Sequence, residues 1–204
     1  MSILFGLMQS MRRLQMLVLG GVIAMVATAA GIVTYLRVTN LESLSTPGAI
    51  ESRVARTARR LALPAVVRNR TNPVPASPEA LVEGMTHYAD HCANCHANDG
   101  SGDTAIGRGL YPKAPDMRLP ATQDLTDGEL FHAIEQGIRF TGMPGWRTGT
   151  ASGEDSSWKL VQFIRHLPRL TESEIEAMKA VNPRSPEDVR QEIEEERFLN
   201  QGAQ

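Results

Sequence analysis

The sequence has very little cysteine, no excess of positive charge and no run of alternating polar and apolar residues. Two cysteines among 204 residues are too few for the several bridges of a disulfide scaffold. Lys and Arg number 21 against 23 Asp and Glu, which gives a net charge of −2, without the basic excess typical of nucleic-acid-binding proteins. Without alternation there is no indication of half-buried strands. These absences disfavour DNA or RNA as a partner and indicate a mostly helical chain.

Charge is entirely absent from residues 14–36, and arginines flank this run on both sides. A helix rises about 1.5 Å per residue, so a run of this length spans the roughly 30 Å hydrocarbon layer of a membrane. We therefore expect a transmembrane anchor over residues 14–36, with residues 1–13 in the cytoplasm. A secretory signal cleaved near residues 27–29 stays open as the alternative, because Ala-Thr-Ala resembles a cleavage site.

Residues 37–77 are rich in arginine and end in a proline-rich stretch. We expect a short basic amphipathic helix over about residues 47–63, followed by a semi-stiff spacer, because proline fixes φ and removes a hydrogen-bond donor. The segment is thus predicted to be a tether. Its arginines fit a solvated helix face and a docking patch for anionic lipid head groups equally well.

From residue 78 onwards the pattern predicts short helices joined by irregular loops. The expected helices are residues 79–91, capped by Ser77; a helix opened by the capping-box sequence Thr126-x-x-Glu129; and residues 156–167, stopped by Pro168. Glycines and prolines crowd residues 97–124, which predicts a long loop. A compact domain over residues 78–170 follows from this pattern.

Residues 171–204 are expected to form an acidic helical tail after this domain. Helical spacing predicts one helix over residues 171–179 and a second, very acidic helix over residues 186–199. The second helix has so few apolar positions that we expect it to be solvated, frayed or docked on a partner.

The string Cys92-Ala93-Asn94-Cys95-His96 carries the clearest chemical signal in the chain. Two thiols at C-x-x-C spacing can add to the two vinyl groups of one haem, and the histidine that follows can bind the iron. A thioredoxin-like dithiol is disfavoured because no preceding strand is predicted. A structural zinc site would need a second pair of ligands, and no other cysteine exists. The motif therefore predicts one covalently attached haem c.

Over roughly residues 78–170 the sequence resembles the class I c-type cytochromes, of the short monohaem kind found in bacterial oxidases and dehydrogenases. The matching features are Gly84 and Tyr88 before the motif, A-N-D-G-S-G after it, the loop Tyr111–Met117, the sequence T-G-M-P-G-W at residues 141–146, and a final helix with Trp158. The resemblance implies an all-α cytochrome c fold, with three to five short helices around one haem. The transmembrane helix and the helical tail are added at its two ends.

The resemblance also implies that His96 and Met143 are the two axial ligands of the haem iron. A thioether on a loop constrained by glycine and proline can approach iron without a helix in the way. Met117 lies closer to the motif in sequence and Met85 lies on the same helix as the motif, so both are weaker candidates. Ligation by two histidines stays open; the other histidines are His87, His91, His132 and His166, all on expected helices.

Two further roles are implied by the same family. A proline carbonyl in the loop Tyr111–Met117 is expected to orient the ring of His96, and we choose Pro115 over Pro112. Either Arg118 or Arg139 could pair with a haem propionate, although an ordinary solvated arginine explains each equally well.

Iron held by histidine and methionine has no open position for substrate, so the resemblance implies an electron carrier, not an enzyme. We expect a single-pass protein of the bacterial cytoplasmic membrane with its haem domain in the periplasm. Its expected partners are the membrane and redox proteins, either as an anchored shuttle or as a small subunit of a respiratory complex. The alternatives are a haem enzyme or sensor with an open iron position, and a mainly structural subunit of a membrane redox complex.

Overall fold

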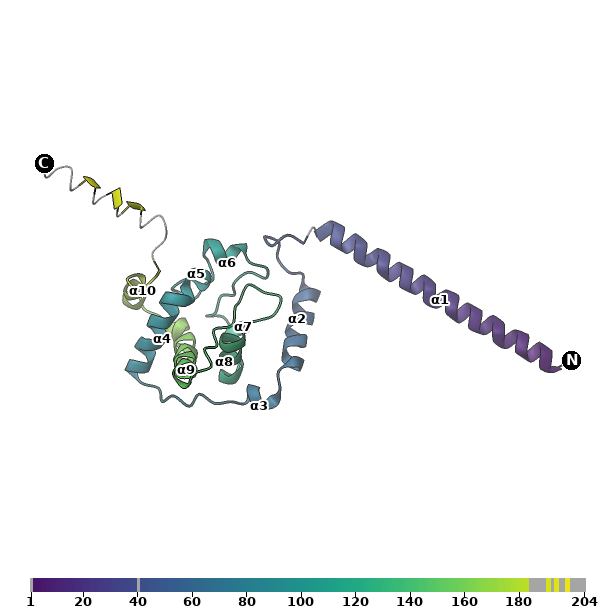
Figure 1. Cartoon of the computed structure of the whole chain (residues 1–204), viewed down its shortest axis with the longest axis horizontal. Coiled ribbons are helices and arrows are strands. Elements are labelled where there is room, and N and C mark those ends of the chain that lie inside the picture. Colours follow the sequence, from purple (N-terminus) through teal and green to yellow (C-terminus); the bar gives the residue numbers. More distant parts are fainter. Residues whose placement is uncertain (1, 40, 184–189, 192, 195–196, 199–204) are drawn as a thin grey trace. The chain divides into compact units, whose positions relative to one another are not determined.

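The computed structural model describes residues 2–39, 41–183, 190–191, 193–194 and 197–198, and Figure 1 shows their arrangement. The chain divides into two compact units, residues 1–42 and 43–204. The described residues contain helices and no strand, which confirms the predicted all-α class.

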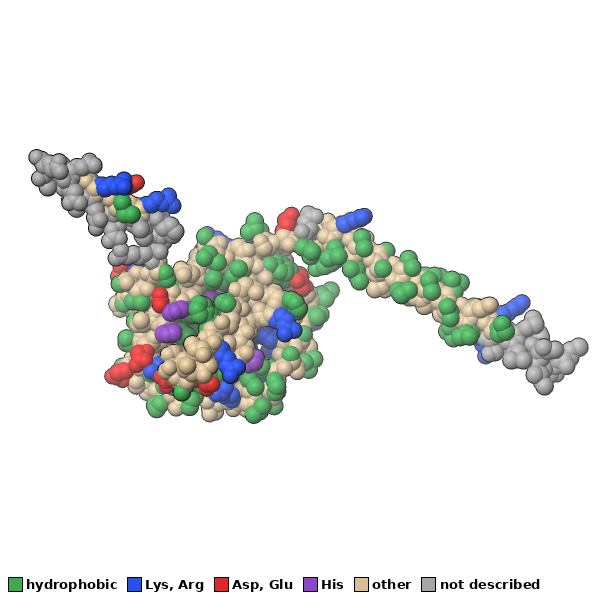
Figure 2. Space-filling view, viewed as in Figure 1, with side chains coloured by type: hydrophobic (Ala, Val, Ile, Leu, Met, Phe, Trp, Pro, Cys, Tyr) green, Lys and Arg blue, Asp and Glu red, His purple; other side chains and the backbone are tan. Residues whose placement is uncertain are grey.

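The first unit is one long helix, α1 (Ser2–Thr39). Its portion Met11–Thr39 is long and apolar enough to cross a membrane, and none of it is buried within the protein. Figure 2 shows apolar side chains along the visible face of this helix. The hydroxyls of Thr28 and Thr34 each donate to the carbonyl four residues earlier, at 2.8 Å, so these polar groups are satisfied within the helix itself. The predicted anchor lies within this helix, which extends beyond it at both ends.

The second unit begins with α2 (Ala49–Ala62) and the single turn α3 (Ala65–Arg68). The α2 helix agrees closely with the expected basic helix. No residue of α2 is buried, but the hydroxyl of Tyr111 donates to a carboxylate oxygen of Glu51 at 2.6 Å. This bond joins α2 to a loop of the compact domain.

Residues 64–77, which we call the docked segment, lie against the domain instead of forming the expected free spacer. The glycine at position 128 permits this approach, because a Cβ there would lie 2.2 Å from the carbonyl oxygen of Val67. The hydroxyl of Thr126 donates to the carbonyl of Arg68 at 2.6 Å. The start of helix α8 (Asp127–Gln136) is therefore in direct backbone contact with the docked segment.

Side-chain amides hold the rest of the docked segment. Asn72 donates from Nδ2 to the carbonyl of Trp158 at 2.9 Å, and Gln162 donates to the carbonyl of Val74 at 2.8 Å. Gln162 thereby satisfies a backbone carbonyl of the proline-rich stretch, and Oδ1 of Asn72 accepts from the backbone amide of Val74 at 2.9 Å. Polar bonds of this kind leave no hydrophobic pattern, which explains why the sequence suggested a spacer.

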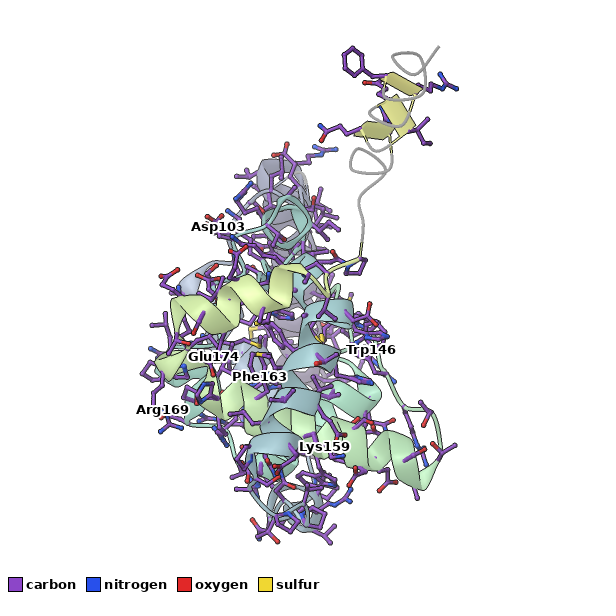
Figure 3. All side chains as sticks on the ribbon, turned by 90° about the vertical axis from the view of Figure 1, so that its left-hand side faces the viewer. Asp103, Trp146, Lys159, Phe163, Arg169 and Glu174 are labelled. Carbon is purple, nitrogen blue, oxygen red and sulfur yellow. The ribbon has the colours of Figure 1, made fainter. Side chains whose placement is uncertain are left out.

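The centre of the domain is formed by α4 (Pro78–His91), α8 (Asp127–Gln136) and α9 (Ala151–His166). Helices α4 and α9 touch at Gly84, where a Cβ would lie 2.3 Å from the carbonyl oxygen of Lys159. The fully buried rings of Tyr88 and Phe163 lie 5.0 Å apart between the same two helices. Figure 3 labels Phe163 and Lys159, which both lie on α9 within the domain.

Hydroxyl caps fix where these helices begin. Ser77 accepts from the amide of Ala80 at the start of α4, and Thr126 and Glu129 form the predicted capping box at α8. Thr150 accepts from the amide of Gly153, so α9 begins at Ala151, earlier than the expected start at residue 156.

The start of the expected tail belongs to the domain. After the short 3-10 helix η1 (Leu167–Arg169), α10 (Glu172–Lys179) matches the helix predicted there, and its Met178 is fully buried. The compact part therefore extends beyond residue 170. Much of the second expected tail helix, residues 186–199, lies outside the described residues; the described pairs 190–191, 193–194 and 197–198 are helical.

Candidate functional site

The C-x-x-C-H motif forms the turn that joins α4 to the short helix α5 (Ala93–His96). The amide of Cys92 donates to the carbonyl of Tyr88 at 2.8 Å, and the amide of His96 donates to the carbonyl of Cys92 at 2.9 Å. Residues three apart on a helical turn are neighbours, so Cys92 and Cys95 lie on one side of this turn. Both cysteines are free thiols, as two thioether bonds to one group would require.

Burial raises the pKa of the Cys92 thiol to about 12, with a smaller contribution from neighbouring Cys95, whose own pKa is also raised by burial. Both cysteines are therefore protonated at neutral pH.

Two backbone features hold the histidine of the motif in place. Ala97, directly after it, adopts a left-handed conformation with φ of 60°, and its carbonyl accepts from the buried hydroxyl of Tyr88 at 3.0 Å. The amide of Gly102 donates to the carbonyl of His96 at 2.8 Å. The chain thus turns sharply after the motif and returns across it.

The ring of His96 has an unsatisfied polar atom inside the protein. Its Nδ1 atom is buried and lacks a partner in hydrogen-bonding geometry. Burial lowers the pKa of His96, and the backbone carbonyl of Pro115 opposes this shift in part. The ring is therefore neutral at pH 7, which is the form that binds iron. The Pro115 carbonyl is thus near the ring without completing a hydrogen bond to Nδ1. A neutral ring beside a carbonyl fits a metal ligand, because metal-bound histidines donate their other N–H to such groups.

Glycine at position 102 brings Pro115 to this ring. Gly102 has φ of 74°, and a Cβ there would lie 2.5 Å from the carbonyl oxygen of Ala114 and 3.1 Å from that of Pro115. The amide of Ala114 in turn donates to the carbonyl of Gly107 at 3.0 Å. The loop that carries Pro115 therefore packs against Gly102, and the role expected for the Pro115 carbonyl stays a prediction.

The helix α6 (Ala105–Gly109) packs against α5. A Cβ on Gly107 would lie 2.2 Å from the carbonyl oxygen of Cys95, so only glycine permits this approach. Thr104 caps α6 at the amide of Gly107 and donates from the same hydroxyl to the carbonyl of Asn94 at 2.7 Å. The expected long loop of residues 97–124 thus contains this helix, as well as the single turn α7 (Pro120–Gln123).

Residues 137–146, which we call the Met143 loop, form a turn closed by its own hydrogen bonds. Gly137 ends α8 with φ of 68°, and the amide of Ile138 donates to the carbonyl of Met143 at 3.1 Å. The hydroxyl of Thr141 donates to the carbonyl of Ile138 at 2.7 Å and accepts from the amide of Met143 at 3.1 Å. The backbone that carries the predicted second ligand is therefore well defined.

Two contacts place the Met143 loop beside the motif. A Cβ on Gly142 would lie 2.5 Å from the side chain of Leu110, directly after α6. The ring of Trp146, labelled in Figure 3, meets the ring of His91 edge-on with centroids 5.3 Å apart, and His91 directly precedes the first cysteine. The structure thus brings the segment with Met143, which is half-buried, to the attachment turn.

The other methionines considered as ligands belong to the interior. Met117 is buried in the hydrophobic core, and its amide donates to the carbonyl of Gly100 at 2.8 Å. Met85 on α4 packs against the same core. Neither lies on a loop of the kind that the Met143 loop provides.

The remaining histidines occupy helices, as expected. The exposed rings of His87 and His91 stack 5.0 Å apart on α4, and His166 bonds to Glu174 at 2.8 Å. His132 is half-buried on α8. Among the described residues, no group of three or more His, Cys, Asp and Glu side chains could hold a metal ion.

Of the two arginines considered for a haem propionate, Arg118 is already paired. It donates to the carboxylate of Asp116 at 2.7 Å and to that of Asp99 at 2.9 Å, and these bonds raise its pKa. Arg139 is exposed and directly precedes Phe140 in the Met143 loop. The arrangement favours Arg139 over Arg118 for such a contact.

Sequence reasoning did not identify the residues that position the site but are not themselves proposed to bind haem. Gly102, Gly107 and Thr141 act through close backbone contacts and through bonds to residues next to the ligands. The glycines stood out in the sequence, but glycine is common in loops and nothing marked these two. Thr141 did occur in the string that carried the family resemblance.

The comparisons with known proteins agree with this geometry. Residues 79–164 match the family model described as cytochrome c oxidase, cbb3-type, subunit III. A search of the curated proteins gave no match. The matched range contains the motif, the Met143 loop and most of α9, so the resemblance seen in the sequence is confirmed. The chain therefore carries a c-type cytochrome domain, of a family that uses haem for electron transfer, together with an N-terminal helix that fits a membrane anchor.

Proposed function

We propose that this protein is a monohaem cytochrome c that transfers single electrons at the periplasmic face of a bacterial cytoplasmic membrane. The observation that carries the proposal is the half-buried His96, whose buried Nδ1 atom lacks a partner, next to two free thiols on one helical turn. A structural histidine in a protein core would be expected to have its polar atoms satisfied.

Each candidate residue has a distinct part in this proposal. Cys92 and Cys95 would hold one haem through thioether bonds, and His96 and Met143 would bind its iron. The carbonyl of Pro115 orients the ring of His96. A haem bound in this way supplies one-electron iron chemistry.

The ligand set supports an electron carrier over an enzyme. A histidine and a methionine together fill both axial positions, and a methionine ligand raises the reduction potential. The hydrogen bonds within the Met143 loop keep Met143 in a fixed place, which favours a ligand that stays bound during electron transfer. Redox proteins are then the partners, because no substrate reaches the metal.

The location of the protein follows from the α1 helix and from haem attachment, and its partners follow from the family match. The α1 helix holds the protein in the membrane as a single-pass anchor, and the attachment of haem c implies a domain on the periplasmic side. The matching family is described as an oxidase subunit, which supports the role of a small subunit in a respiratory complex. An anchored shuttle is the other form that this function can take. Residues 78–170, extended by α10, form the haem domain.

The mass and the visible spectrum of the purified protein test this function. We expect the mass of one haem to be added covalently, and a weak red absorption band in the oxidised protein that reports a methionine–iron bond. The variant His96→Ala should prevent normal haem loading. A mature chain with the mass of the bare polypeptide would exclude the proposal.

The second ligand is tested with matched methionine variants. Met143→Ala should keep the covalent haem but lose the red band and lower the potential, whereas Met117→Leu and Met85→Leu should keep the band. Loss of the band in a control variant instead would assign the ligand elsewhere. An oxidised wild-type protein that lacks the band and binds small ligands would indicate the haem enzyme or sensor.

A further inference from the structure

The α2 helix has two distinct exposed faces, one apolar and one basic. Ile50, Val54 and Leu61 lie on one face at helical spacing, with exposed fractions of 82%, 62% and 82%. Burial of such side chains is favourable, so three of them on one face form an apolar contact surface. Figure 2 shows apolar side chains at the surface over this helix.

The other face of α2 is basic. Its four arginines are Arg53, Arg56, Arg59 and Arg60, all exposed. None of them forms an ion pair within the described part of the chain. The single acidic residue of α2, Glu51, is used in the bond to Tyr111 on the side that faces the domain. With four arginines and one glutamate, the helix therefore has a net charge of +3, and its arginines are free to bind anions.

A helix with an apolar face, an arginine-rich face and little overall hydrophobicity is suited to a membrane surface. Its apolar side chains enter the boundary between head groups and acyl chains, while guanidinium groups bind phosphates, often through two parallel hydrogen bonds. An acidic protein would match the arginines but would leave the apolar face exposed. The pairing of both faces on one helix favours a lipid surface.

The position of α2 in the chain supports the same partner. Nine residues separate Thr39 at the end of α1 from Ala49 at the start of α2. At no more than about 3.6 Å per residue, this linker keeps α2 close to any membrane that holds α1. The membrane surface is thus always present at high local concentration, so even a weak lipid contact would be occupied.

We propose that α2 is an interfacial helix that binds anionic phospholipid through its arginines and inserts Ile50, Val54 and Leu61 among the lipid head groups. The proposal rests on α1 being the membrane anchor of the proposed function. Because α2 also bonds to the loop at Tyr111, lipid binding would restrict how the haem domain is oriented toward the membrane and its partners.

The test uses the full-length, haem-loaded protein in vesicles. With both native cysteines bound to haem, a cysteine introduced by Leu61→Cys is the single free thiol and can carry an environment-sensitive fluorophore. Ala55→Cys provides the matched control, because it is exposed on the same helix but away from the apolar face. The vesicles contain phosphatidylcholine alone or with phosphatidylglycerol, and brominated acyl chains quench the fluorophore on contact.

We expect quenching of the label at position 61 to be at least roughly twofold stronger than at position 55 in phosphatidylglycerol vesicles. The difference should disappear in phosphatidylcholine alone, in about 1 M salt, and in a variant with all four α2 arginines changed to glutamine. A variant with Arg147→Gln and Arg169→Gln, two exposed arginines outside α2, should keep it. An unchanged haem spectrum shows that each variant is folded.

The other outcomes contradict the proposal in distinguishable ways. Equal quenching with and without phosphatidylglycerol would exclude recognition of anionic lipid. Protein that floats with vesicles while both labels stay unquenched would exclude an interfacial α2 and leave the anchor intact. Protein that fails to float with any vesicles would overturn both the α1 anchor and the role of α2.

Discussion

Asn98 and Asn182 exchange two side-chain hydrogen bonds, of 2.7 and 3.0 Å, although they lie far apart in sequence. Asn182 also donates to the carbonyl of Ala89 at 3.0 Å. Asn98 is two residues beyond His96, so the segment directly after α10 is fastened to the turn that carries the C-x-x-C-H motif. The segment after α9 therefore supports the site as well as lying beside it.

Replacement of Asn182 tests this link. Asn182→Ala leaves the amide of Asn98 and the carbonyl of Ala89 without their partners, and we expect it to lower the free energy of unfolding by about 1–3 kcal/mol. Chemical denaturation followed by haem absorbance measures the loss. Lys179→Ala is the control, because it removes only an exposed ion pair with Glu176 and should cost less than about 1 kcal/mol. Equal effects of the two variants would contradict the link.

The backbone at Gly102 gives a second prediction. Gly102→Ala requires a left-handed conformation that costs an alanine about 1–2 kcal/mol, and it pushes on the carbonyls of Ala114 and Pro115. We expect lower stability and a higher reduction potential, because a histidine that loses its carbonyl partner is a weaker donor to ferric iron. Denaturation and redox titration measure the two effects.

Gly109→Ala is the control for this substitution. Gly109 is in the same stretch of chain, but a Cβ there would meet nothing within 4 Å. It should leave the potential unchanged and keep the stability within about 1 kcal/mol. A shift in potential of the same size in both variants would show that Gly102 acts by some route other than Pro115.

The hydroxyl of Thr141 gives a third prediction, about the second ligand. Thr141→Val keeps the shape of the side chain but removes its bonds to the carbonyl of Ile138 and the amide of Met143. We expect the haem to stay covalently bound. The red methionine–iron band should be weaker, and on heating it should change at a lower temperature than in the wild type. Thr141→Ser restores the hydroxyl and should restore the band. If the valine variant keeps the wild-type band at all temperatures, the loop bonds do not position Met143.

The carboxylate of Glu174 predicts how stability depends on pH. Burial alone raises its pKa, but bonds from the amide and hydroxyl of Thr171 and from His166 together lower it below the ordinary value of 4.5. A lowered folded-state pKa stabilises the protein above the unfolded-state value, and this stabilisation is lost as pH falls through the folded-state value.

Glu174→Gln should therefore destabilise the protein above about pH 5, with the difference from wild type shrinking as pH falls toward about 3. Denaturation curves at a series of pH values measure the slope. Glu176→Gln, an exposed glutamate on the same helix, serves as the control. A difference between wild type and Glu174→Gln that stays constant across this range would contradict the assignment.

Local signals made much of this fold predictable. The capping box of Thr126 and Glu129 placed the start of α8, and the uncharged run of residues 14–36 placed α1. The motif at residues 92–96 predicts a haem attachment turn by its chemistry alone, and the helical turn found there fits this prediction. Each of these features depends on residues close together in sequence, where spacing determines geometry.

Features that depend on distant residues were not predictable in the same way. Met178 is fully buried between elements, but one methionine in an acidic helix gives no indication of what it packs against. The docked segment is held by side-chain amides and by one arginine. Nothing in the sequence indicates which groups such polar side chains contact. The same holds for the match of Gly102 to the carbonyls of its neighbouring loop, since a glycine only permits a contact that other residues supply.

The arginine that holds the docked segment gives the last prediction. The guanidinium of Arg70 lies 4.5 Å from the centre of the Phe131 ring and 5.2 Å from that of Trp158, and these two rings stack 4.1 Å apart. A cation over aromatic rings contributes about 0.5–1 kcal/mol at a partly exposed site. Arg70→Gln removes this contact and a long ion pair with Glu154, at 3.8 Å.

We expect Arg70→Gln to speed amide hydrogen exchange in the docked segment by roughly two- to fivefold, because local opening becomes easier by that free energy. Amides of α4 and α9 should exchange as in the wild type, since they open only with the whole domain. Arg68→Gln is the matched control. Arg68 bonds to Thr126 through its backbone carbonyl, which the substitution keeps, so amide exchange in the docked segment should not change. Equal exchange in both variants would mean that the amide bonds from Asn72 and Gln162 alone hold the segment.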